Sequence, residues 1–319
     1  MALLDDLAAC RLRTHARARS ARTDAAAHRA LADYLAPGLA QAEAGEGFLA
    51  AWPDGGVRAY VLGWRDPEPW HGQPAWMVAL DHDPADAAGA AYVCDALDAM
   101  GLDPDFEVQL DVAFTQVRRH LLASGVGIDS VTQDGVPAEA LARLVAAKDP
   151  PTAPPPGLDF APLAAAHVDA VVALHRRLFL EKPQFCAFGA EPAWLARFHD
   201  ELMRAVDGGP GCREVALRGG EVVGYWGADF SHQALWGHRA GMAVMFAPEL
   251  QGQGLAWRVY RRMLEAQVAA GVEIFRGGTS QPAVMAIGRL LGRRPLTLWM
   301  RPRARTFFEP AWFAPALSE

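Results

Sequence analysis

Residues 243–256 have the residue types and the spacing of a phosphate-binding turn, reading A-V-M-F-A-P-E-L-Q-G-Q-G-L-A. An apolar run stops at Pro248, a turn with two glycines follows, and an amphipathic helix is predicted to begin at about Leu255. Glycines allow backbone N–H groups to approach a phosphate closely, and the positive end of the helix dipole favours a negative charge. We therefore expect a phosphorylated cofactor to bind at this turn.

Other phosphate or metal sites fit the sequence less well. A Rossmann dinucleotide site needs a third glycine three residues after Gly254, where the sequence has Trp257, and the Gly-Lys-Ser/Thr loop of nucleoside triphosphatases is absent. The run D-H-D at 81–83 directly follows a strand-like segment and precedes Pro84, which is typical of a polar turn. No metal site is predicted.

The residues after 157 predict the elements that position the glycine turn. In chain order they are a strand at about 158–161, helices at 163–180 and 191–206, strands at 213–218, 221–230 and 238–247, a helix at 255–270, a strand at 272–277, a helix at 282–291, and strands at 296–302 and 305–309. The R-G-G-E sequence between the second and third strands is a hairpin signal.

The residues before 149 predict a similar order. They read as helical sequence to about residue 36, strands at 47–52, 57–64 and 75–81, a helix at 86–100, a strand at 106–111, a helix at 114–123 and a strand at 126–132. The N-terminal counterpart of the glycine turn is P-A-D-A-A-G-A-A, with one glycine and an aspartate. An acidic residue at a helix N-terminus competes with a phosphate for the same amides. We interpret the chain as a duplication whose first copy binds no cofactor.

The sequence D-P-P-T-A-P-P-P-G at 149–157 separates the two halves. Five prolines in nine residues form a stiff, extended connector. We predict a degenerate domain at 1–148, a Pro-rich linker at 149–157 and a cofactor-binding domain at 158–319, as the length of 319 residues also suggests. Short strands at the end of each half could let the two sheets join edge to edge.

Composition and charge restrict the cellular setting and the partners. Residues 1–150 carry 22 acidic and 12 basic side chains, whereas residues 151–319 carry 15 and 18. The Arg-rich segment at 11–22 lies in the acidic half, so nucleic-acid binding is not expected. No secretory signal and no apolar run long enough to span a bilayer is evident, and the four cysteines form no C-x-x-C pair. We expect a cytoplasmic protein without a membrane partner, and the sequence leaves its oligomeric state open.

The turn and the order of elements together resemble the GNAT superfamily of acyl-CoA-dependent N-acyltransferases. Gln251, Gly254 and Ala256 occupy the places of its Gln/Arg-x-x-Gly-x-Gly/Ala signature. The resemblance implies an α/β fold of two tandem GNAT-like domains, each a mixed, mostly antiparallel sheet flanked by helices. Tandem GNAT proteins such as the mycothiol-synthase-like enzymes share this layout of a degenerate N-terminal copy and a cofactor-binding C-terminal copy.

The resemblance implies acetyl-CoA as co-substrate. Amides of residues 251–255 would hold the pyrophosphate, and residues 245–247 would pair with the pantetheine arm and supply an amide near the thioester oxygen. Arginines on the two later helices, Arg258, Arg261, Arg262 and Arg289, could meet the 3′-phosphate. The cofactor-binding residues predicted in this way are Met245, Phe246, Ala247, Gln251, Gly252, Gln253, Gly254, Leu255, Ala256, Arg258 and Arg289.

The catalytic groups are less well defined. GNAT enzymes often carry a tyrosine that protonates the leaving thiolate, and its place falls at Gly288 here. A general base should face the amine, and the candidates are Glu249, Asp229, His232 and His238. We expect an acceptor cleft between the two halves, lined by Trp226, His232 and Trp236.

The sequence therefore favours an acetyl-CoA-dependent N-acetyltransferase that acts by direct attack in a ternary complex. Its acceptor is an amine, either a small molecule or a peptide, that the sequence does not identify. The missing tyrosine keeps a second hypothesis open: a non-catalytic GNAT-like module that binds acetyl-CoA or a protein partner.

Overall fold

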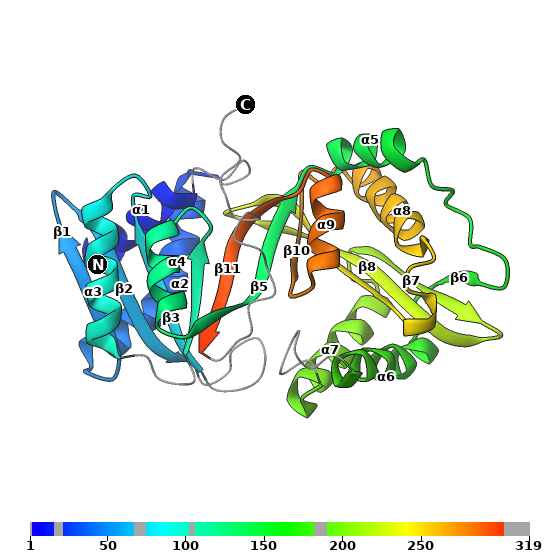
Figure 1. The fold of residues 1–319 in the computed structure, drawn as a ribbon, viewed down its shortest axis with the longest axis horizontal. Coiled ribbons are helices and arrows are strands. Elements are labelled where there is room, and N and C mark those ends of the chain that lie inside the picture. The colour runs from blue at the N-terminus through cyan, green and yellow to red at the C-terminus, as the bar shows by residue number, and fades with distance from the viewer. Residues whose placement is uncertain (1, 16–21, 67–74, 102–105, 182–189, 303–319) are drawn as a thin grey trace.

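The computed structural model describes residues 2–15, 22–66, 75–101, 106–181 and 190–302 (Figure 1). The elements before the linker are α1 (Ala2–His15), α2 (Ala25–Glu43), β1 (Phe48–Pro53), β2 (Val57–Asp66), β3 (Ala75–His82), α3 (Ala87–Met100), β4 (Phe106–Asp111), α4 (Thr115–Ala123), β5 (Val126–Gly135) and α5 (Pro137–Lys148). Those after it are β6 (Asp159–Pro162), α6 (Ala165–Glu181), α7 (Pro192–Val206), β7 (Gly211–Arg218), β8 (Glu221–Gln233), β9 (Gly237–Phe246), the short η2 (Pro248–Leu250), α8 (Leu255–Ala269), β10 (Ile274–Thr279), α9 (Pro282–Leu290) and β11 (Arg294–Pro302).

The predicted strands and helices within these ranges are confirmed, with boundaries that differ by a few residues, except at the N-terminus: the helical sequence predicted to about residue 36 forms two helices, and the second ends at Glu43. The strand predicted at 305–309 lies outside the described residues. Helix α5 is an element that the sequence did not predict. It begins with Pro137 at its first turn, a favoured place for proline, and buries Ala140 and Leu144, which are four residues apart on one face.

The strands of the described residues form a single mixed sheet. Its eleven strands have the order β1-β2-β3-β4-β11-β5-β10-β9-β8-β7-β6. Two of the neighbouring pairs, β3 with β4 and β9 with β10, are parallel, and the others are antiparallel. The expectation of a mixed, mostly antiparallel sheet is thereby confirmed.

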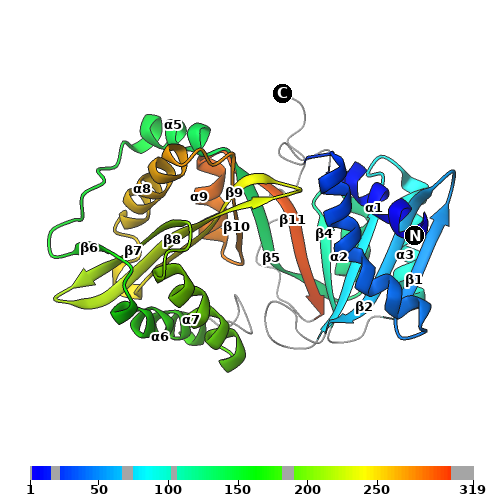
Figure 2. The same ribbon diagram turned by 180° about the vertical axis from the view of Figure 1, so that it is seen from behind.

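The two halves are joined by an exchange of strands at the centre of the sheet. Strand β11, the last described strand, lies between β4 and β5 of the N-terminal half, and β5 lies between β11 and β10 (Figures 1 and 2). Leu298 on β11 is paired with Leu110 on one side and Val131 on the other. The halves therefore interleave their last strands, instead of meeting edge to edge as the sequence suggested.

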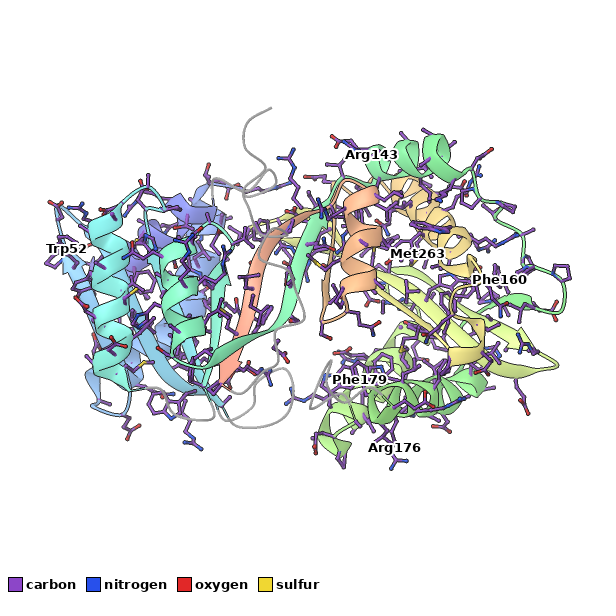
Figure 3. The ribbon with its side chains drawn as sticks, viewed as in Figure 1. Trp52, Arg143, Phe160, Arg176, Phe179 and Met263 are labelled. Atoms are coloured by element: carbon purple, nitrogen blue, oxygen red, sulfur yellow. The ribbon has the colours of Figure 1, made fainter. Side chains whose placement is uncertain are left out.

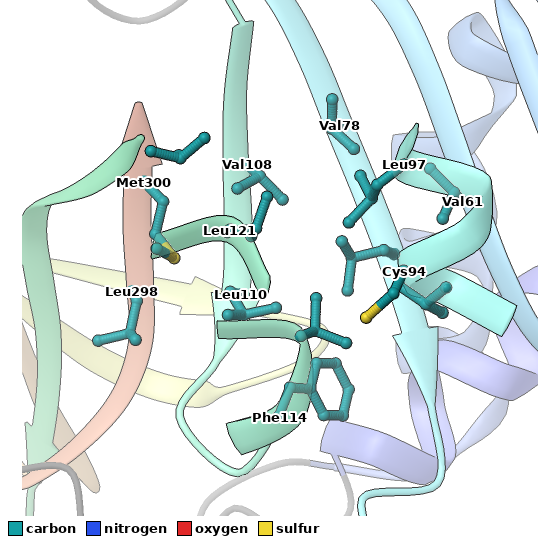
Figure 4. Close-up of a cluster of buried hydrophobic side chains, with 14 of the residues drawn as sticks. Val61, Val78, Cys94, Leu97, Val108, Leu110, Phe114, Leu121, Leu298 and Met300 are labelled. Carbon is teal, nitrogen blue, oxygen red and sulfur yellow. The ribbon is translucent and has the colours of Figure 1, made fainter. Parts of the chain in front are cut away.

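Buried side chains explain this exchange. Leu298 and Met300 of β11 are fully buried in the core of the N-terminal half, beside Val108 and Leu110 of β4 (Figure 4). An outer position in the sheet would expose these side chains, and burying each one contributes about 1.5–3 kcal/mol. The 149–157 boundary stays a prediction, because the two predicted domains share this core.

Helices cover both faces of the sheet in each half. In the C-terminal half, α6 and α7 lie against one face, and α5, α8 and α9 lie against the other (Figures 1 and 2). In the N-terminal half, α3 and α4 lie opposite α1 and α2. None of the helices in the described ranges combines the length and apolar content of a membrane span.

Candidate functional site

The glycine turn forms an open cradle of backbone amides at the start of α8. Gly252 and Gly254 have φ angles of 78° and 73°, a left-handed conformation that glycine adopts without strain. No side chain caps the helix. Within the described chain, the five consecutive amides from Gly252 to Ala256 donate no hydrogen bond. These donors and the helix dipole make the turn suited to an anion.

Two glutamines hold this turn in place. The Gln251 side chain donates from Nε2 to the Phe246 carbonyl at 3.1 Å, and the Gln253 side chain donates from Nε2 to the Glu249 carbonyl at 2.6 Å. Both amide groups thus tie the turn back to the end of β9 and to η2. The sequence assigned Gln251 and Gln253 to the cofactor, and the structure adds a role in shaping the turn.

Strands β9 and β10 separate immediately before the turn. Their parallel pairing covers Arg239 to Gly241 on β9 and ends at Arg276 on β10. Beyond this point β10 pairs with β5, while β9 stays paired with β8 up to Phe246. The edge of β9 from Met242 to Phe246 therefore borders a gap about 13 Å long, at roughly 3.3 Å per residue.

Alternation along β9 determines which amides face this gap. The Ala247 N–H donates to the Val223 carbonyl on the β8 side at 2.9 Å, so the Met245 N–H points to the same side. The Val244 and Phe246 amides consequently point into the gap. Among residues 245–247, Phe246 is placed to bond a pantetheine arm through its amide, whereas the Ala247 amide is already bonded.

A cavity of about 950 Å³ connects the gap with the glycine turn. Gly252, Gly254, Leu255 and Ala256 line it at one end, together with Gln251, Met245 and Phe246. Its other walls come from β8, β10, α6, α7 and α9. Figure 3 shows Phe179, a wall residue, on the side of α6 that faces the sheet, and Arg176 on the opposite side.

The arginines of α8 mainly hold the linker. Arg258 donates to the Ala153 carbonyl at 2.8 Å, and Arg261 donates to the Pro150 carbonyl at 2.8 Å. Arg262 donates to the Thr152 carbonyl at 3.3 Å and forms an ion pair with Glu214. Arg289 is exposed on α9 and does not line the cavity. The predicted contacts of Arg258 and Arg289 with the cofactor stay predictions.

Gln133 occupies the space beside Gly288, where GNAT enzymes often have a tyrosine. A Cβ atom at Gly288 would lie 2.3 Å from Gln133 Oε1, so a larger residue there would require the Gln133 side chain on β5 to move. The Gln133 side chain is fully buried, and in the described chain neither its Oε1 nor its Nε2 has a hydrogen-bond partner. Glycine at position 288 therefore allows Gln133 of the N-terminal half to pack closely against α9 of the C-terminal half.

The bases predicted from the sequence lie outside the cavity lining, apart from Asp229. His232 and His238 stack on each other at 4.5 Å near the far end of the β8–β9 hairpin, and the His238 ring bonds the Gly271 carbonyl. Glu249 lies 3.8 Å from Arg177. Asp229 lines the cavity and forms an ion pair with Arg213.

The predicted aromatic lining of the acceptor cleft is also placed elsewhere. Trp226 is fully buried against Phe160 and donates to Glu214 from its indole nitrogen at 3.0 Å. Trp236 packs against the Arg276 guanidinium. The aromatic wall comes instead from Trp194 and Phe198 on α7.

Two residues of the cavity that could act as proton acceptors, His175 and Glu201, were not found from the sequence. His175 on α6 is buried, stacks on Trp194 at 4.3 Å, and its Nδ1 lies 3.1 Å from the sulfur of Met245. Glu201 on α7 also lines the cavity. A histidine on the apolar face of a predicted helix, V-V-A-L-H at 171–175, was the available signal. Tyr225 lines the cavity as well, and burial raises its pKa to about 12.

In the N-terminal half, side chains fill the place that corresponds to the glycine turn. Asp86 caps α3 by accepting the Ala88 amide at 3.1 Å, and Arg58 donates to Asp86 at 2.6 Å. The Arg58 hydrogen bond lowers the pKa of Asp86 to about 2. A negative charge therefore stands at the helix N-terminus, beside a smaller cavity of about 560 Å³.

The D-H-D run at 81–83 has ordinary structural contacts. Asp81 is buried and accepts hydrogen bonds from Arg11 and Tyr60, and His82 stacks on Phe114. Across the described ranges, no group of three or more histidine, cysteine or acidic side chains is arranged to hold a metal ion.

Comparisons with known proteins bear on the fold. No protein-family model and no curated protein matches the sequence. The chain is similar to the structure of a GCN5-related N-acetyltransferase from Sphaerobacter thermophilus, at 16% identity and a TM-score of 0.54 over 96% of this chain and 95% of that one. A glucosamine N-acetyltransferase region of a fungal multi-domain GH3 β-N-acetylglucosaminidase has 15% identity and a TM-score of 0.52, covering 93% of this chain and 36% of that one. A tandem GNAT protein from the clavulanic acid biosynthesis pathway has 15% identity and a TM-score of 0.49, over 95% and 96%.

The two similarities with TM-scores above 0.5 bear on the fold of the chain as a whole. They extend over both halves of the chain. The chain therefore has the fold of GCN5-related N-acetyltransferases, with an open glycine turn in its C-terminal half.

Proposed function

We propose that the protein transfers an acetyl group from acetyl-CoA to an amine. One observation carries the proposal: Gly252 and residues 254–256, whose amides are unbonded, and Val244 and Phe246, whose amides face the gap, line the same cavity. The first set suits a pyrophosphate, and the second suits the amide-containing arm and the thioester of the same molecule. We assign both to one bound acetyl-CoA.

The amine would reach the thioester carbonyl from the α6–α7 side of the sheet. The Val244 or Phe246 amide would donate to the carbonyl oxygen as negative charge develops on it. Glu201 and His175 are the proton acceptors that we assign to this side, acting directly or through water. Asp229 is less suited to the role because Arg213 is already paired with it.

The departing thiolate needs no tyrosine at Gly288 in this scheme. Tyr225 lines the cavity, and its raised pKa of about 12 keeps the hydroxyl protonated at neutral pH. It can therefore donate a hydrogen bond to the thiolate, and water can supply the proton.

The second hypothesis is a non-catalytic protein that binds acetyl-CoA. The packing of Gln133 against Gly288 favours it, because glycine stands at the family's usual tyrosine position and the buried Gln133 side chain fills the space beside it. Thiol release from acetyl-CoA, measured with a panel of amines against the hydrolysis background, separates the two functions. Release above background with any amine supports the enzyme. Acetyl-CoA binding without such release supports the binding protein, and no binding contradicts both.

Other features of the protein remain expectations from the sequence. They are the cytoplasmic location, the absence of nucleic-acid and membrane partners, and the choice between a small-molecule and a peptide amine. The oligomeric state stays open.

A further inference from the structure

Two arginines stand side by side where β9 and β10 separate. Arg239 on β9 and Arg276 on β10 both line the cavity. Arg239 is paired with Ile274, and Arg276 is paired with Gly241, so the two arginines are diagonal neighbours on one face of the sheet. Met245 and Tyr225, which pack against residues of α6 and α7, lie on the same face. The arginines thus mark the inner end of the cavity, on its α6–α7 side.

Among the described residues, Arg239 has no carboxylate partner, and Arg276 has a long ion pair with Asp134, its cross-strand neighbour on β5. In the described part of the chain, Arg239 makes a long hydrogen bond, in which its Nε donates to the Ser231 hydroxyl oxygen at 3.5 Å. Arg276 Nη2 lies 3.9 Å from Asp134, which is beyond hydrogen-bond distance, and its Nε and Nη2 have no hydrogen-bond partner. The Arg276 side chain is 14% exposed and lies 3.7 Å from the Trp236 ring centroid.

Burial and proximity make this pair unfavourable when the cavity is empty. The pKa of Arg276 is lowered to about 10, mainly by burial; Asp134 opposes this shift, and the charge of Arg239 adds to it. Burial also lowers the pKa of Arg239. Both side chains nevertheless remain charged at neutral pH. Two adjacent, partly desolvated cations are stabilised by an anion between them.

The other charged groups of the cavity are already engaged or lie elsewhere. Arg213 is paired with Asp229, and Arg293 donates to the Gln133 and Gly277 carbonyls at 2.9 Å. The remaining acid in the lining is Glu201, on α7. With Asp134 as the one described carboxylate near the two arginines, a net positive charge therefore remains at Arg239 and Arg276.

There is room for a ligand group beside this pair. A Cβ atom added to Gly241 would meet no atom within 4 Å. The neighbouring Ala243, on the same face, is exposed, and Gly278 adds no side chain. The floor between the two arginines and the aromatic wall of α7 is thus open and built from small residues.

We propose that the amine acceptor carries an anionic group, a carboxylate or a phosphate, which Arg239 and Arg276 bind together. The inference rests on the proposed function, because it takes this side of the cavity to be the acceptor site. Two guanidinium forks match the oxygen geometry of either anion and can donate several charge-assisted hydrogen bonds. The bound anion lies at the inner end of the cavity and directs the amine toward the thioester carbonyl.

The first test compares charged amines with their neutral analogues. Suitable pairs are glutamate and glycine with their carboxamides, O-phosphoethanolamine with ethanolamine, and glucosamine 6-phosphate with glucosamine. In the wild type, the better class of anionic amine should exceed its neutral partner at least tenfold in kcat/KM for thiol release. Arg239→Gln should reduce this preference to less than about threefold through the acceptor KM, while the acetyl-CoA Kd stays within about twofold. The pair that responds distinguishes a carboxylate from a phosphate.

Two variants serve as comparisons. Arg276→Gln should act like Arg239→Gln, and Arg218→Gln, an exposed arginine of β7, should keep the wild-type preference. Because Arg276 packs on Trp236, the stability of Arg276→Gln is measured by an unfolding curve before its kinetics are compared with those of the wild type. An equal response to charged and neutral amines in the wild type, or an unchanged preference in Arg239→Gln, would overturn the proposal.

A binding measurement separates this inference from the proposed function. Calorimetry with acetate and with inorganic phosphate, in the presence of saturating CoA, should detect binding to the wild type that Arg239→Gln weakens at least tenfold. This result supports the anion site even if no amine in the panel is acetylated. If neutral amines are acetylated and no anion binding is detected, the proposed acetyltransferase function is supported and the anion site is refuted. Absence of anion binding in a protein without turnover refutes it as well.

Discussion

Two substitutions of Gly254 distinguish the effect of backbone strain at the glycine turn from the effect of a negative charge there. With φ at 73° and no atom within 4 Å of a Cβ, alanine at this position adds backbone strain without a clash. Gly254→Ala should lower the free energy of unfolding by about 1–2 kcal/mol. Gly254→Glu adds the same strain and a negative charge beside the five unbonded amides. For a separation of ~5 Å and an effective dielectric constant of ~20–80, its repulsion of one phosphate charge is about 1–3 kcal/mol.

The assay is calorimetric titration of both variants with acetyl-CoA. The glutamate variant should bind about 5- to 150-fold more weakly than the alanine variant. S-acetylpantetheine, which lacks the pyrophosphate, provides the control, and the two variants should bind it equally. Equal affinity of the variants for acetyl-CoA, or an equal loss with S-acetylpantetheine, would refute the assignment of the turn to the pyrophosphate.

Three further outcomes are expected. Gln133→Met replaces a fully buried, unbonded amide with an apolar group of similar volume. The free energy of unfolding, measured in urea, should therefore rise by about 1–3 kcal/mol. A decrease would mean that the Gln133 amide has a hydrogen-bond partner. Because the folded pKa of Asp86 is about 2, below its ordinary 3.8, the stabilisation it provides is complete above pH 4 and is lost as the pH falls toward 2. Asp86→Asn should flatten the thermal unfolding profile in that window, and an unchanged slope would contradict the role of the Arg58 contact. Of Glu201→Gln and His175→Ala, at least one should lower kcat for acetyl transfer by about 100-fold or more, and two fully active variants would remove both as bases.

The glycine turn could be predicted because its signals are local. Pro248 ends a strand, and Gly252 and Gly254 supply the left-handed residues that the turn into α8 needs. The R-G-G-E hairpin is equally local, since Gly219 and Gly220 have φ angles of 58° and 87°. Element order, and through it the fold, followed from such signals and from hydrophobic periodicity.

The features that escaped prediction depend on contacts between distant segments. The exchange of β5 and β11 follows from where Leu298 and Met300 are buried, which no short window of sequence reveals. The α8 arginines had the pattern of a solvated helix face, yet Arg258 and Arg262 bond the linker more than 100 residues away. For the same reason, His175 enters the candidate site only through the packing of α6 against β9.

Counting the acetyl-CoA molecules bound per chain tests the central claim most directly. Native mass spectrometry of the wild type should show one bound molecule, because the C-terminal half has the open cradle and Asp86 caps the helix N-terminus at the corresponding place in the N-terminal half. Gly254→Glu should reduce the bound fraction, and Asp86→Asn should leave the count at one. A wild-type chain that binds no acetyl-CoA, or that binds two, would contradict the account.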